Sequence, residues 1–222
     1  MKRSAINDIL EQGDAFIRSF GQILPPFAYW TPQEMRSDAA APIRERGLGW
    51  DITDYGLGRF NELGLFLFTT RNGTFSDLST GRGMLYAEKV MITRENQLSP
   101  MHRHNIKAED IINGGGGDLI IELFAPNEDG TIDRDSDVTV PSDGQDVTLP
   151  AGGKLRLSPG QSVTLMPGIW HAFWAEKGDC LVREVSTVND DRTDNVFEMD
   201  IGRFSSIEED QDPKRLLVSD YG

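Results

Sequence analysis

The chain begins with apolar positions spaced three and four residues apart. Between residues 4 and 20 these positions are Ile6, Ile9, Leu10, Gly13, Phe16, Ile17 and Phe20. This is the period of an amphipathic helix, for which Ser4 is a candidate N-cap. The helix must end before Pro25 and Pro26, because consecutive prolines cannot continue a helix and hold their predecessors extended. A second, short helix is predicted to open at residues 30–32.

Beyond Trp50 the pattern changes to short apolar runs separated by Gly, Asn and Asp. The runs that we interpret as strands cover residues 65–70, 85–93, 118–124, 154–157, 162–166, 170–176 and 181–187. Many evenly spaced strands with turn residues between them indicate a β-sandwich or β-barrel. Glycines 114–117 predict a tight turn. The polar stretch 126–144 predicts an exposed hairpin or loop inserted between barrel strands.

The size and composition of the chain favour a single domain. It has 222 residues, of which 38% are apolar and 26% charged. At this length folding buries roughly 70% of the surface that the extended chain exposes. We expect one domain over residues 1–222, in which the helices and arm of residues 1–48 pack on a barrel formed by residues 49–222.

Charge and cysteine content narrow the class of partner. The formal charge of −14 would repel a phosphate backbone, so nucleic acid is not expected as a partner. Cys180 is the only cysteine, which excludes an intrachain disulfide and a Cys-rich zinc cluster.

The first ten residues do not have the pattern of a signal peptide, and apolar stretches such as residues 63–68 are far shorter than the roughly 20 residues that span a bilayer. We expect a cytoplasmic protein without a membrane partner.

The three histidines of the chain form the main chemical signal. His102 and His104 are separated by one residue, so a strand would place both imidazoles on one face. Glu109 has the opposite parity to His104, and a turn or bulge near residues 105–107 would be needed to return its carboxylate to that face. Spacing alone leaves Asp110 as an alternative.

His171 follows much later, at the start of another predicted strand, and joins the pair only if the barrel folds the two strands side by side. Separate structural or surface histidines are the alternative interpretation. Because every histidine of the chain belongs to this pattern, we favour a metal site formed by His102, His104, Glu109 and His171. Three imidazoles and a carboxylate suit Mn²⁺, Fe²⁺, Co²⁺, Ni²⁺ or Zn²⁺ and leave coordination positions open for catalysis.

The spacing of these ligands resembles the two motifs of the cupin superfamily. The pattern His102-x-His104-x4-Glu109-x6-Gly116 is similar to the first motif, and residues 160–171 have the spacing of the second. Asn96 stands where the first motif usually begins with glycine, and Ala175 stands where the second usually ends with asparagine. The second motif is also one residue tighter between its proline and its histidine. None of these departures affects the four ligands.

Within the cupins the chain resembles the D-lyxose ketol-isomerase family. The resemblance is carried by residues 24–28, 49–56, 102–113 and 184–187. It implies a cupin-type antiparallel β-barrel (a double-stranded β-helix, or jelly roll) with an N-terminal helical segment. It also implies one six-coordinate Mn²⁺ on the three histidines and the glutamate, and aldose–ketose interconversion of a free pentose or hexose. D-lyxose to D-xylulose is the expected reaction, with D-mannose to D-fructose as a second.

Such an isomerase needs a group that moves a proton between neighbouring carbons. The intermediate is an enediolate, whose charge two metal-chelating oxygens would share. Glu184 is the first candidate base, because alternation along residues 180–186 places it on one face with Val182 and Ser186. The alternative for Glu184 is an outer-face charge neutralised by nearby basic side chains.

Further candidates carry weaker signals. Lys107 shares the parity of Glu109 and would donate to a substrate oxygen or relay a proton, unless it is a solvated lysine on the barrel rim. Asp194 is another candidate acid or base, although its charge-rich segment also fits a surface loop. Four residues are candidates to border the sugar, although tryptophans mostly fill cores: Trp50, Asp51, Trp170 and Trp174.

Three other functions fit the same pattern less well. A cupin dioxygenase would use the same ligands with Fe²⁺ and dioxygen. A phosphosugar isomerase would need a basic cluster, for which Arg44, Arg46 and Arg59 would have to converge. A non-catalytic sugar-binding cupin ranks third, because four metal ligands would be superfluous in a simple binder. Exposed aromatics and β-edges favour a homodimer.

Overall fold

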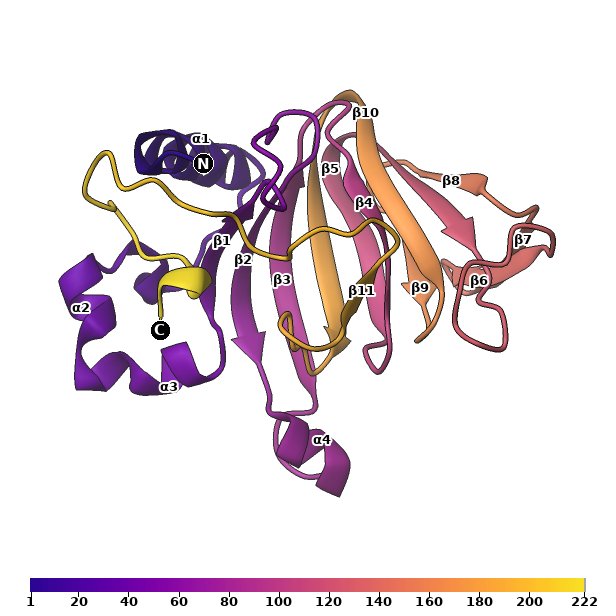
Figure 1. The fold of residues 1–222 in the computed structure, drawn as a ribbon, viewed down its shortest axis with the longest axis horizontal. Coiled ribbons are helices and arrows are strands. Elements are labelled where there is room, and N and C mark those ends of the chain that lie inside the picture. The colour runs from indigo at the N-terminus through magenta and orange to yellow at the C-terminus, as the bar shows by residue number, and fades with distance from the viewer. Residues whose placement is uncertain (222) are drawn as a thin grey trace.

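The computed structural model describes residues 1–221, and most of its regular structure is β-strand (Figure 1). The strands are β1 (Gly49–Thr53), β2 (Leu65–Asn72), β3 (Tyr86–Thr93), β4 (Ser99–His104), β5 (Glu109–Phe124), β6 (Val138–Ser142), β7 (Gln145–Leu149), β8 (Gly153–Leu157), β9 (Ser162–Leu165), β10 (Trp170–Thr187) and β11 (Asn195–Phe197). The helices are α1 (Arg3–Ser19), α2 (Pro32–Arg36), α3 (Ala41–Glu45) and α4 (Phe75–Thr80), with 3-10 turns at Pro26–Tyr29, Asp38–Ala40 and Val218–Asp220. The predicted mainly β class is confirmed.

Nine of the strands form one curled antiparallel sheet, and β6 and β7 form a separate hairpin. The long strands β5 and β10 pair along nearly their whole length at its centre. β10 continues to β3 and β4, and β5 continues to β8 and β9. The path from β10 through β3 and β2 ends at β1, while β4 carries the short β11. The two runs predicted at 170–176 and 181–187 are therefore one strand, β10.

An irregularity in the middle of β10 changes which residues face the barrel interior. His171 and Phe173 point inward in the first half of the strand, whereas Val182 and Glu184 do so in the second. The pairing register with β5 shifts twice, between Glu176 and Cys180 and between Leu181 and Val182, which leaves one extra residue on β10. Since an unbroken strand alternates strictly, this extra residue is what brings His171 and Glu184 to the same side.

Glycines 114–117 lie inside β5 opposite this irregularity, so the predicted tight turn was wrong. Gly115 and Gly116 have φ angles of 141° and 94°, a region that side chains rarely adopt. A Cβ on Gly116 would lie 2.2 Å from the carbonyl oxygen of Asp179 on β10. The glycines thus allow the two long strands to stay paired across the irregularity.

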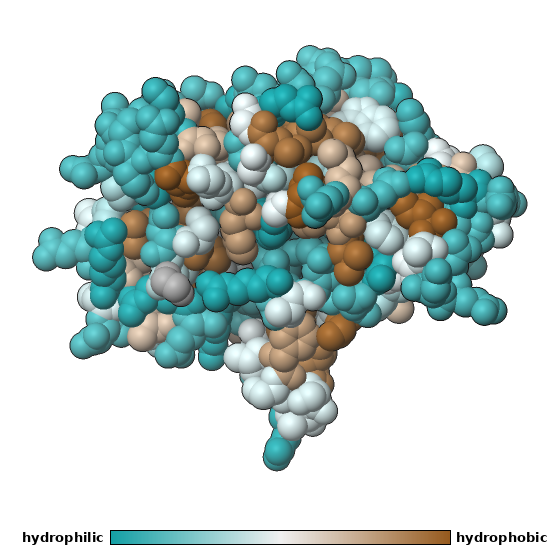
Figure 2. Space-filling model, viewed as in Figure 1, coloured by the Kyte–Doolittle hydropathy of each residue, from teal (hydrophilic) through white to brown (hydrophobic). Residues whose placement is uncertain are grey.

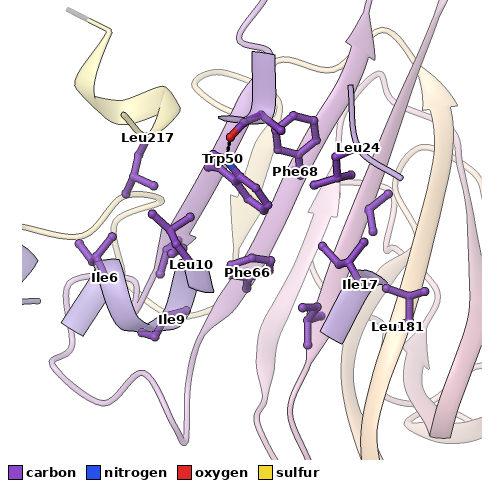
Figure 3. Close-up of a cluster of buried hydrophobic side chains, with 14 of the residues drawn as sticks. Ile6, Ile9, Leu10, Ile17, Leu24, Trp50, Phe66, Phe68, Leu181 and Leu217 are labelled. Atoms are coloured by element: carbon purple, nitrogen blue, oxygen red, sulfur yellow. Dashed lines mark hydrogen bonds between the residues drawn. The ribbon is translucent and has the colours of Figure 1, made fainter. Parts of the chain in front are cut away.

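The N-terminal helix covers one face of the sheet (Figure 3). As the apolar period predicted, α1 buries one side, through which Ile6, Leu10 and Ile17 pack in a cluster with Phe66 and Phe68 of β2. The predicted cap was wrong. The N-cap position is Lys2, and the Ser4 side chain instead donates to Asp210 at 2.6 Å. This helix anchors the outer face of β1, β2 and β3, so the opposite face of these strands is free to line the barrel.

The short helices and the inserted segment refine the predicted pattern. α2 is capped by Thr31, whose side chain accepts from the N–H of Glu34. The predicted exposed stretch 126–144 contains β6 and the turn of the β6–β7 hairpin, and Val138 and Val140 of β6 are buried in the core. The hairpin is therefore partly a core element rather than an exposed insertion.

Within residues 1–221, no helix combines the length and the apolarity needed to cross a bilayer.

Candidate active site

Three histidines meet inside the curled sheet. His102 and His104 come from β4, and His171 comes from the start of β10, where it pairs in register with His102. One ligand atom of each imidazole lies within 4.8 Å of the others, and all three side chains are buried. Strand alternation thus places His102 and His104 on one face, and the fold brings His171 beside them. Together the three side chains form a cluster suited to a metal ion.

Backbone carbonyls set the tautomers of two of these histidines. Nδ1 of His102 donates to the carbonyl oxygen of Pro100 at 2.7 Å, and Nδ1 of His171 donates to that of Ile169 at 3.1 Å. A carbonyl only accepts, so in each ring Nδ1 carries the hydrogen and Nε2 keeps its lone pair. Burial lowers the pKa of His102 well below its ordinary value, and His171 and His104 lower it further. The neutral ring of His102 therefore presents a lone pair to the site, and Nε2 of His171 faces the same site.

Glu109 lies beside two of the three histidines. Its Oε1 lies 3.3 Å from Nε2 of His104 and 3.2 Å from Nε2 of His171. Burial alone would raise the pKa of Glu109, but Lys107 and His104 outweigh it and hold this pKa well below its usual range. The alternative ligand Asp110 points to the other face, where it accepts from the Thr164 hydroxyl at 2.6 Å. Geometry thus favours Glu109 over Asp110.

The residues present fit a divalent cation. Glu109 Oε1 and His171 Nε2 are buried, and neither has a hydrogen-bond partner within residues 1–221. Two acceptors that face each other at 3.2 Å repel unless a cation binds both. Adjacent ligands of an octahedral ion with bonds of about 2.1 Å lie roughly 3 Å apart, which matches this spacing. The donor set is that of a transition metal rather than of calcium.

A distant carboxylate shapes the turn that returns Glu109 to the histidines. Asp194 Oδ1 accepts from the backbone N–H groups of Asn105 and Ile106, and its Oδ2 accepts from that of Lys107, at 2.9 to 3.0 Å. The predicted turn at residues 105–107 is present, and Asp194 satisfies its three donors. Asp194 is buried but is not among the residues that line the cavity beside the histidines. This position makes it a positioning residue for the turn.

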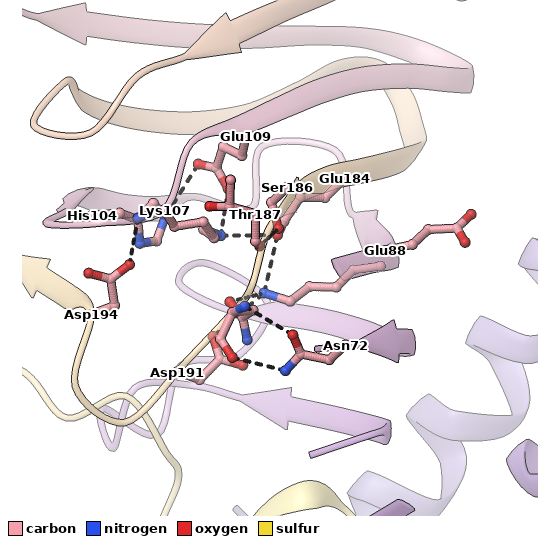
Figure 4. A network of polar contacts seen from close by, with 12 residues as sticks. Asn72, Glu88, His104, Lys107, Glu109, Glu184, Ser186, Thr187, Asp191 and Asp194 are labelled. Carbon is pink, nitrogen blue, oxygen red and sulfur yellow. Dashed lines mark hydrogen bonds and ion pairs between the residues drawn. The ribbon is translucent and has the colours of Figure 1, made fainter. Parts of the chain in front are cut away.

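A chain of buried charges leads away from Glu109 (Figure 4). Lys107 Nζ lies 2.6 Å from Oε2 of Glu109 and 3.0 Å from Oε1 of Glu184. Lys89 Nζ approaches the same Glu184 oxygen at 3.3 Å. Burial would lower the pKa of Lys107, but Glu109 and Glu184 outweigh it and raise this pKa, so the ammonium stays charged. Glu184 therefore faces the interior, held between two lysines, and is not an outer-face charge.

The chain of charges continues through Lys89, Asp191 and Arg203, which the sequence analysis missed, to Asp51, which it had named as a candidate. Lys89 Nζ lies 3.6 Å from Asp191 Oδ1, and Arg203 lies between Asp191 and Asp51, with its Nη2 2.6 Å from Asp51 Oδ2. Burial raises the pKa of Asp51 despite the nearby Arg203. Lys89 and Met91 are two residues apart in the predicted strand 85–93, so strand alternation could have placed Lys89 on the same face as Met91. Arg203 follows no apolar alternation that would have marked it.

Comparison with known proteins agrees with this arrangement. The family model of D-lyxose isomerase matches residues 1–221. A D-lyxose/D-mannose isomerase from Serratia proteamaculans is 48% identical over 100% of this chain and 98% of its own length. A D-lyxose/D-mannose isomerase from Escherichia coli O157:H7 is 46% identical over the same shares. The chain belongs to the D-lyxose isomerase family. Its predicted family, and with it the enzyme class of sugar isomerase, is confirmed.

Solved structures support the fold of this D-lyxose isomerase family member. An L-ribose isomerase from Acinetobacter sp. DL28 superposes with a TM-score of 0.63 at 15% identity, covering 94% of this chain and 98% of the other. The L-ribose isomerase of Cellulomonas parahominis gives a TM-score of 0.59 at 17% identity, with the same coverage. At this identity the likeness concerns the fold alone. It confirms the predicted cupin-type fold.

The structure does not bring the candidate tryptophans to the cavity. Trp50 packs under α1 and donates from Nε1 to the carbonyl of Ala28 at 2.7 Å (Figure 3). Trp170 donates to Gly130 in the inserted loop, and Trp174 lies under the ammonium of Lys154. Neighbouring residues of a strand face opposite sides. Trp50 is next to the inward-facing Asp51, and Trp170 and Trp174 are an odd number of residues from the inward-facing His171, so all three tryptophans face outward. The positions of these tryptophans therefore do not support their predicted place beside the sugar, since none of the three lines the cavity.

Other aromatic rings take that place. Phe173 and Phe197 line the cavity, with ring centres 6.5 Å and 5.7 Å from that of His102. Tyr55 also lines it, and its hydroxyl lies 3.2 Å from the Ser99 hydroxyl. Burial raises the pKa of Tyr55 to about 12, so the phenol stays neutral. Phe173 is two residues from His171 on the same strand, so strand alternation could have predicted that both side chains face the cavity.

The arginines considered for phosphate binding do not reach this cavity. Arg44 and Arg46 line a separate cavity of about 580 Å³ together with Arg192. Arg44 is engaged there by the carbonyls of Met35 and Ser37. Arg59 lies elsewhere, in a surface hollow beside the first residues of the chain. The convergence that a phosphosugar isomerase would require is thus present for two of the three arginines, and not at the histidines.

Proposed function

We propose that this chain is a metal-dependent aldose–ketose isomerase that converts D-lyxose to D-xylulose and D-mannose to D-fructose. The observation that carries the proposal is the shared cavity of Glu184, Lys107 and the cluster formed by His102, His104, His171 and Glu109. The names of the two bacterial relatives, which match over the whole chain, support the choice of sugars. The mixed nitrogen and oxygen donor set suits several divalent transition metals, and Mn²⁺ is the proposed ion because the family resemblance implies it.

The three histidines and Glu109 would hold the ion, which would supply positive charge to two neighbouring oxygens of the open-chain sugar. The rest of the reaction is assigned to side chains. The carbon next to the aldehyde loses its proton, and its electron pair forms the enediolate double bond. The aldehyde carbon then receives a proton, and the proton of the neighbouring hydroxyl moves to the former aldehyde oxygen as the ketone forms. One carboxylate can serve both transfers, because the two carbons are adjacent.

Glu184 is the proposed base. Both lysines contact its Oε1, at 3.0 Å from Lys107 and 3.3 Å from Lys89, which leaves Oε2 to take and return the proton. Lys107 is charged and lies between Glu184 and Glu109, where its ammonium would also stabilise the developing oxyanion. Leu65, Leu67 and Met91 on the cavity wall keep bulk water away from the intermediate.

The charges of the cavity favour a free sugar over a phosphosugar. Each cation that lines the cavity within residues 1–221 already has carboxylate partners: Lys107 with Glu109 and Glu184, Lys89 with Glu184 and Asp191, and Arg203 with Asp51 and Asp191. A phosphate would need positive charge in excess. The hydroxyls of an unphosphorylated aldose need only hydrogen-bond partners.

The test is a metal-reconstitution assay. Protein stripped by a chelator and reloaded with single divalent metals is assayed on free and phosphorylated aldoses in deuterated water. We expect ketose from D-lyxose and D-mannose with Mn²⁺, under anaerobic conditions as well as in air, and deuterium in the product. No ketose with any metal would overturn the isomerase. A requirement for dioxygen would favour the dioxygenase, and complete absence of deuterium would count against proton transfer by Glu184.

A homodimer is part of the proposal and rests on exposed apolar side chains. The projection formed by α4 carries apolar residues on its surface, and Tyr86, which follows it, is 47% exposed (Figure 2). Ile106 and Met166 are exposed near the ends of β4 and β9. Light scattering that gives the mass of one chain would refute the dimer. The cytoplasmic location stays a prediction.

A further inference from the structure

Arg203 has an unusual place in the wall of the histidine cavity. Its side chain is nine-tenths buried, and Nη1 has no hydrogen-bond partner among residues 1–221. Nη2 lies 2.6 Å from Oδ2 of Asp51, the distance of a charge-assisted hydrogen bond. Arg203 is therefore neutralised in charge through Nη2 while the N–H groups of Nη1 remain available. A buried donor without a partner costs stability unless something else satisfies it.

The surroundings fix the guanidinium in position. Asp51 comes from β1 and Asp191 from the segment after β10, and Arg203 Nη2 lies 3.5 Å from Asp191 Oδ2. The ring of Phe204 lies 5.1 Å from the guanidinium carbon. The Arg203 carbonyl accepts from the Thr53 hydroxyl at 2.9 Å, which ties the backbone to the end of β1. A group held from several sides is preorganised for a ligand.

Arg203 belongs to a segment that crosses the opening of the sheet (Figure 1). β11 pairs with β4 on one side of the opening, and residues 203 and 205 bond to Thr53 and Asp54 at the end of β1 on the other. The segment supplies Asn195, Phe197 and Arg203 to the cavity wall, and the four metal-ligand candidates line the same cavity. A molecule held at the histidines is therefore covered by this segment.

We propose that Arg203 binds a sugar hydroxyl beyond the two reacting carbons and so helps to select the substrate. The inference rests on the proposed isomerase function and extends it. The two reacting oxygens would be held at the histidine end, so donors elsewhere on the wall meet the remaining hydroxyls. A neutralised guanidinium suits a hydroxyl, because it offers N–H groups without the surplus charge that attracts phosphate. Asp51 and Asp191 act through Arg203 as positioning residues.

The test combines variants of Arg203 with sugars that lack one hydroxyl. D-lyxose is compared with its 3-deoxy, 4-deoxy and 5-deoxy analogues, and binding of D-arabinitol, which cannot isomerise, is measured by calorimetry on the metal-loaded protein. Arg203→Lys keeps the charge and loses the planar pair of donors. Arg3→Lys is the matched control, because Arg3 is also buried between two carboxylates, Glu209 and Asp220, far from the histidines in the fold.

We expect Arg203→Lys to raise the KM for D-lyxose and the Kd for D-arabinitol by about 10-fold or more, with a much smaller change in kcat. In the wild type one deoxy analogue should bind about 10-fold or more weakly than D-lyxose, and Arg203→Lys should abolish that penalty. Arg3→Lys should leave KM, Kd and the penalty unchanged.

Three results would overturn the assignment. They are the absence of a penalty for every deoxy analogue in the wild type, a penalty that persists in Arg203→Lys, and equal rises of KM in both lysine variants. The first of these results needs no variant, so it can overturn the assignment even where Arg203→Lys fails to fold. A wild type that isomerises no sugar refutes the proposed function instead, while D-arabinitol binding still reports on Arg203.

Discussion

The ammonium of Lys107 lies 2.6 Å from Oε2 of Glu109, on the side of the carboxylate that faces away from the histidines. Oε1 of Glu109 faces the histidines, so one carboxylate joins the candidate metal ligands to the buried chain of charges. Lys107 extends that chain to Glu184 at 3.0 Å. The proposed base and the proposed ligand therefore share a single cation, and a change at Lys107 affects both.

Replacing Lys107 by Met should damage both stability and turnover. It leaves Glu109 and Glu184 buried with less compensating charge, and breaking a buried ion pair by removing one partner costs about 3 to 5 kcal/mol. We expect a loss of this size in the free energy of unfolding, measured in urea, and a fall in kcat of about 10-fold or more. Lys154→Met, at an exposed cation above Trp174, is the control and should change neither quantity. Unchanged turnover in Lys107→Met would contradict its assigned role.

Replacing Glu184 by Gln tests the base directly. The amide keeps the shape of the side chain and its place beside the lysines but cannot take a proton. We expect kcat to fall by about 100-fold or more while elemental analysis still finds the metal. Glu88→Gln is the matched control, since Glu88 lies on the neighbouring β3 and pairs with Arg71 on the surface. Turnover that survives in Glu184→Gln would assign the proton transfer to another group.

Replacing Asp194 by Ala should loosen the turn that carries Lys107. Three backbone N–H groups lose their acceptor, and buried donors without partners cost about 1 to 3 kcal/mol. We expect a decrease of about 2 kcal/mol or more in the free energy of unfolding, and a lower kcat. Asp190→Ala removes a carboxylate that caps an exposed turn through Arg192 and Thr193, and should have little effect. If both variants were equally stable, Asp194 would not organise the turn.

Acid should destabilise the metal-free protein below about pH 6.5. Burial lowers the folded-state pKa of His102 and His104 beneath the ordinary value of 6.5. The unfolded chain therefore takes up protons first as the pH falls, and stability that is fully present above pH 6.5 is lost through the folded-state pKa values. Each histidine contributes a slope of up to about 1.4 kcal/mol per pH unit.

The measurement is urea unfolding of chelator-treated protein between about pH 7.5 and about pH 5, a range that brackets the ordinary histidine pKa of 6.5. His104→Gln removes one of the two groups, so the slope should fall to roughly half. A free energy of unfolding that stays constant over this range in the unaltered protein would show that the buried rings are not held neutral.

Local alternation predicted much of the site. The spacing of His102 and His104 predicted a shared face, and the opposite parity of Glu109 predicted a turn at residues 105–107, which the structure contains. The inward direction of Glu184 followed from the short run 180–186. These inferences succeeded because each depends only on the two-residue period of a strand.

The misses have a common physical cause. Trp50 and Asp51 were grouped together because β1 was not among the predicted strands, and adjacent residues of a strand face opposite sides. Arg203 and Asp191 lie in segments whose position is set by ion pairs across the fold, which no local pattern encodes. The acceptor that holds the turn, Asp194, likewise comes from a distant part of the chain.

The irregularity in β10 also constrains how the length of this chain can vary. Surface turns usually tolerate insertions and deletions, and residues 177–179 are polar or small, with Lys177 and Asp179 exposed. Here, removing a single residue would restore strict alternation along β10 and rotate Glu184 to the outside while leaving His171 in place. A family member with one residue fewer in this segment, and no compensating change in β5, would keep the candidate metal ligands and lose the base.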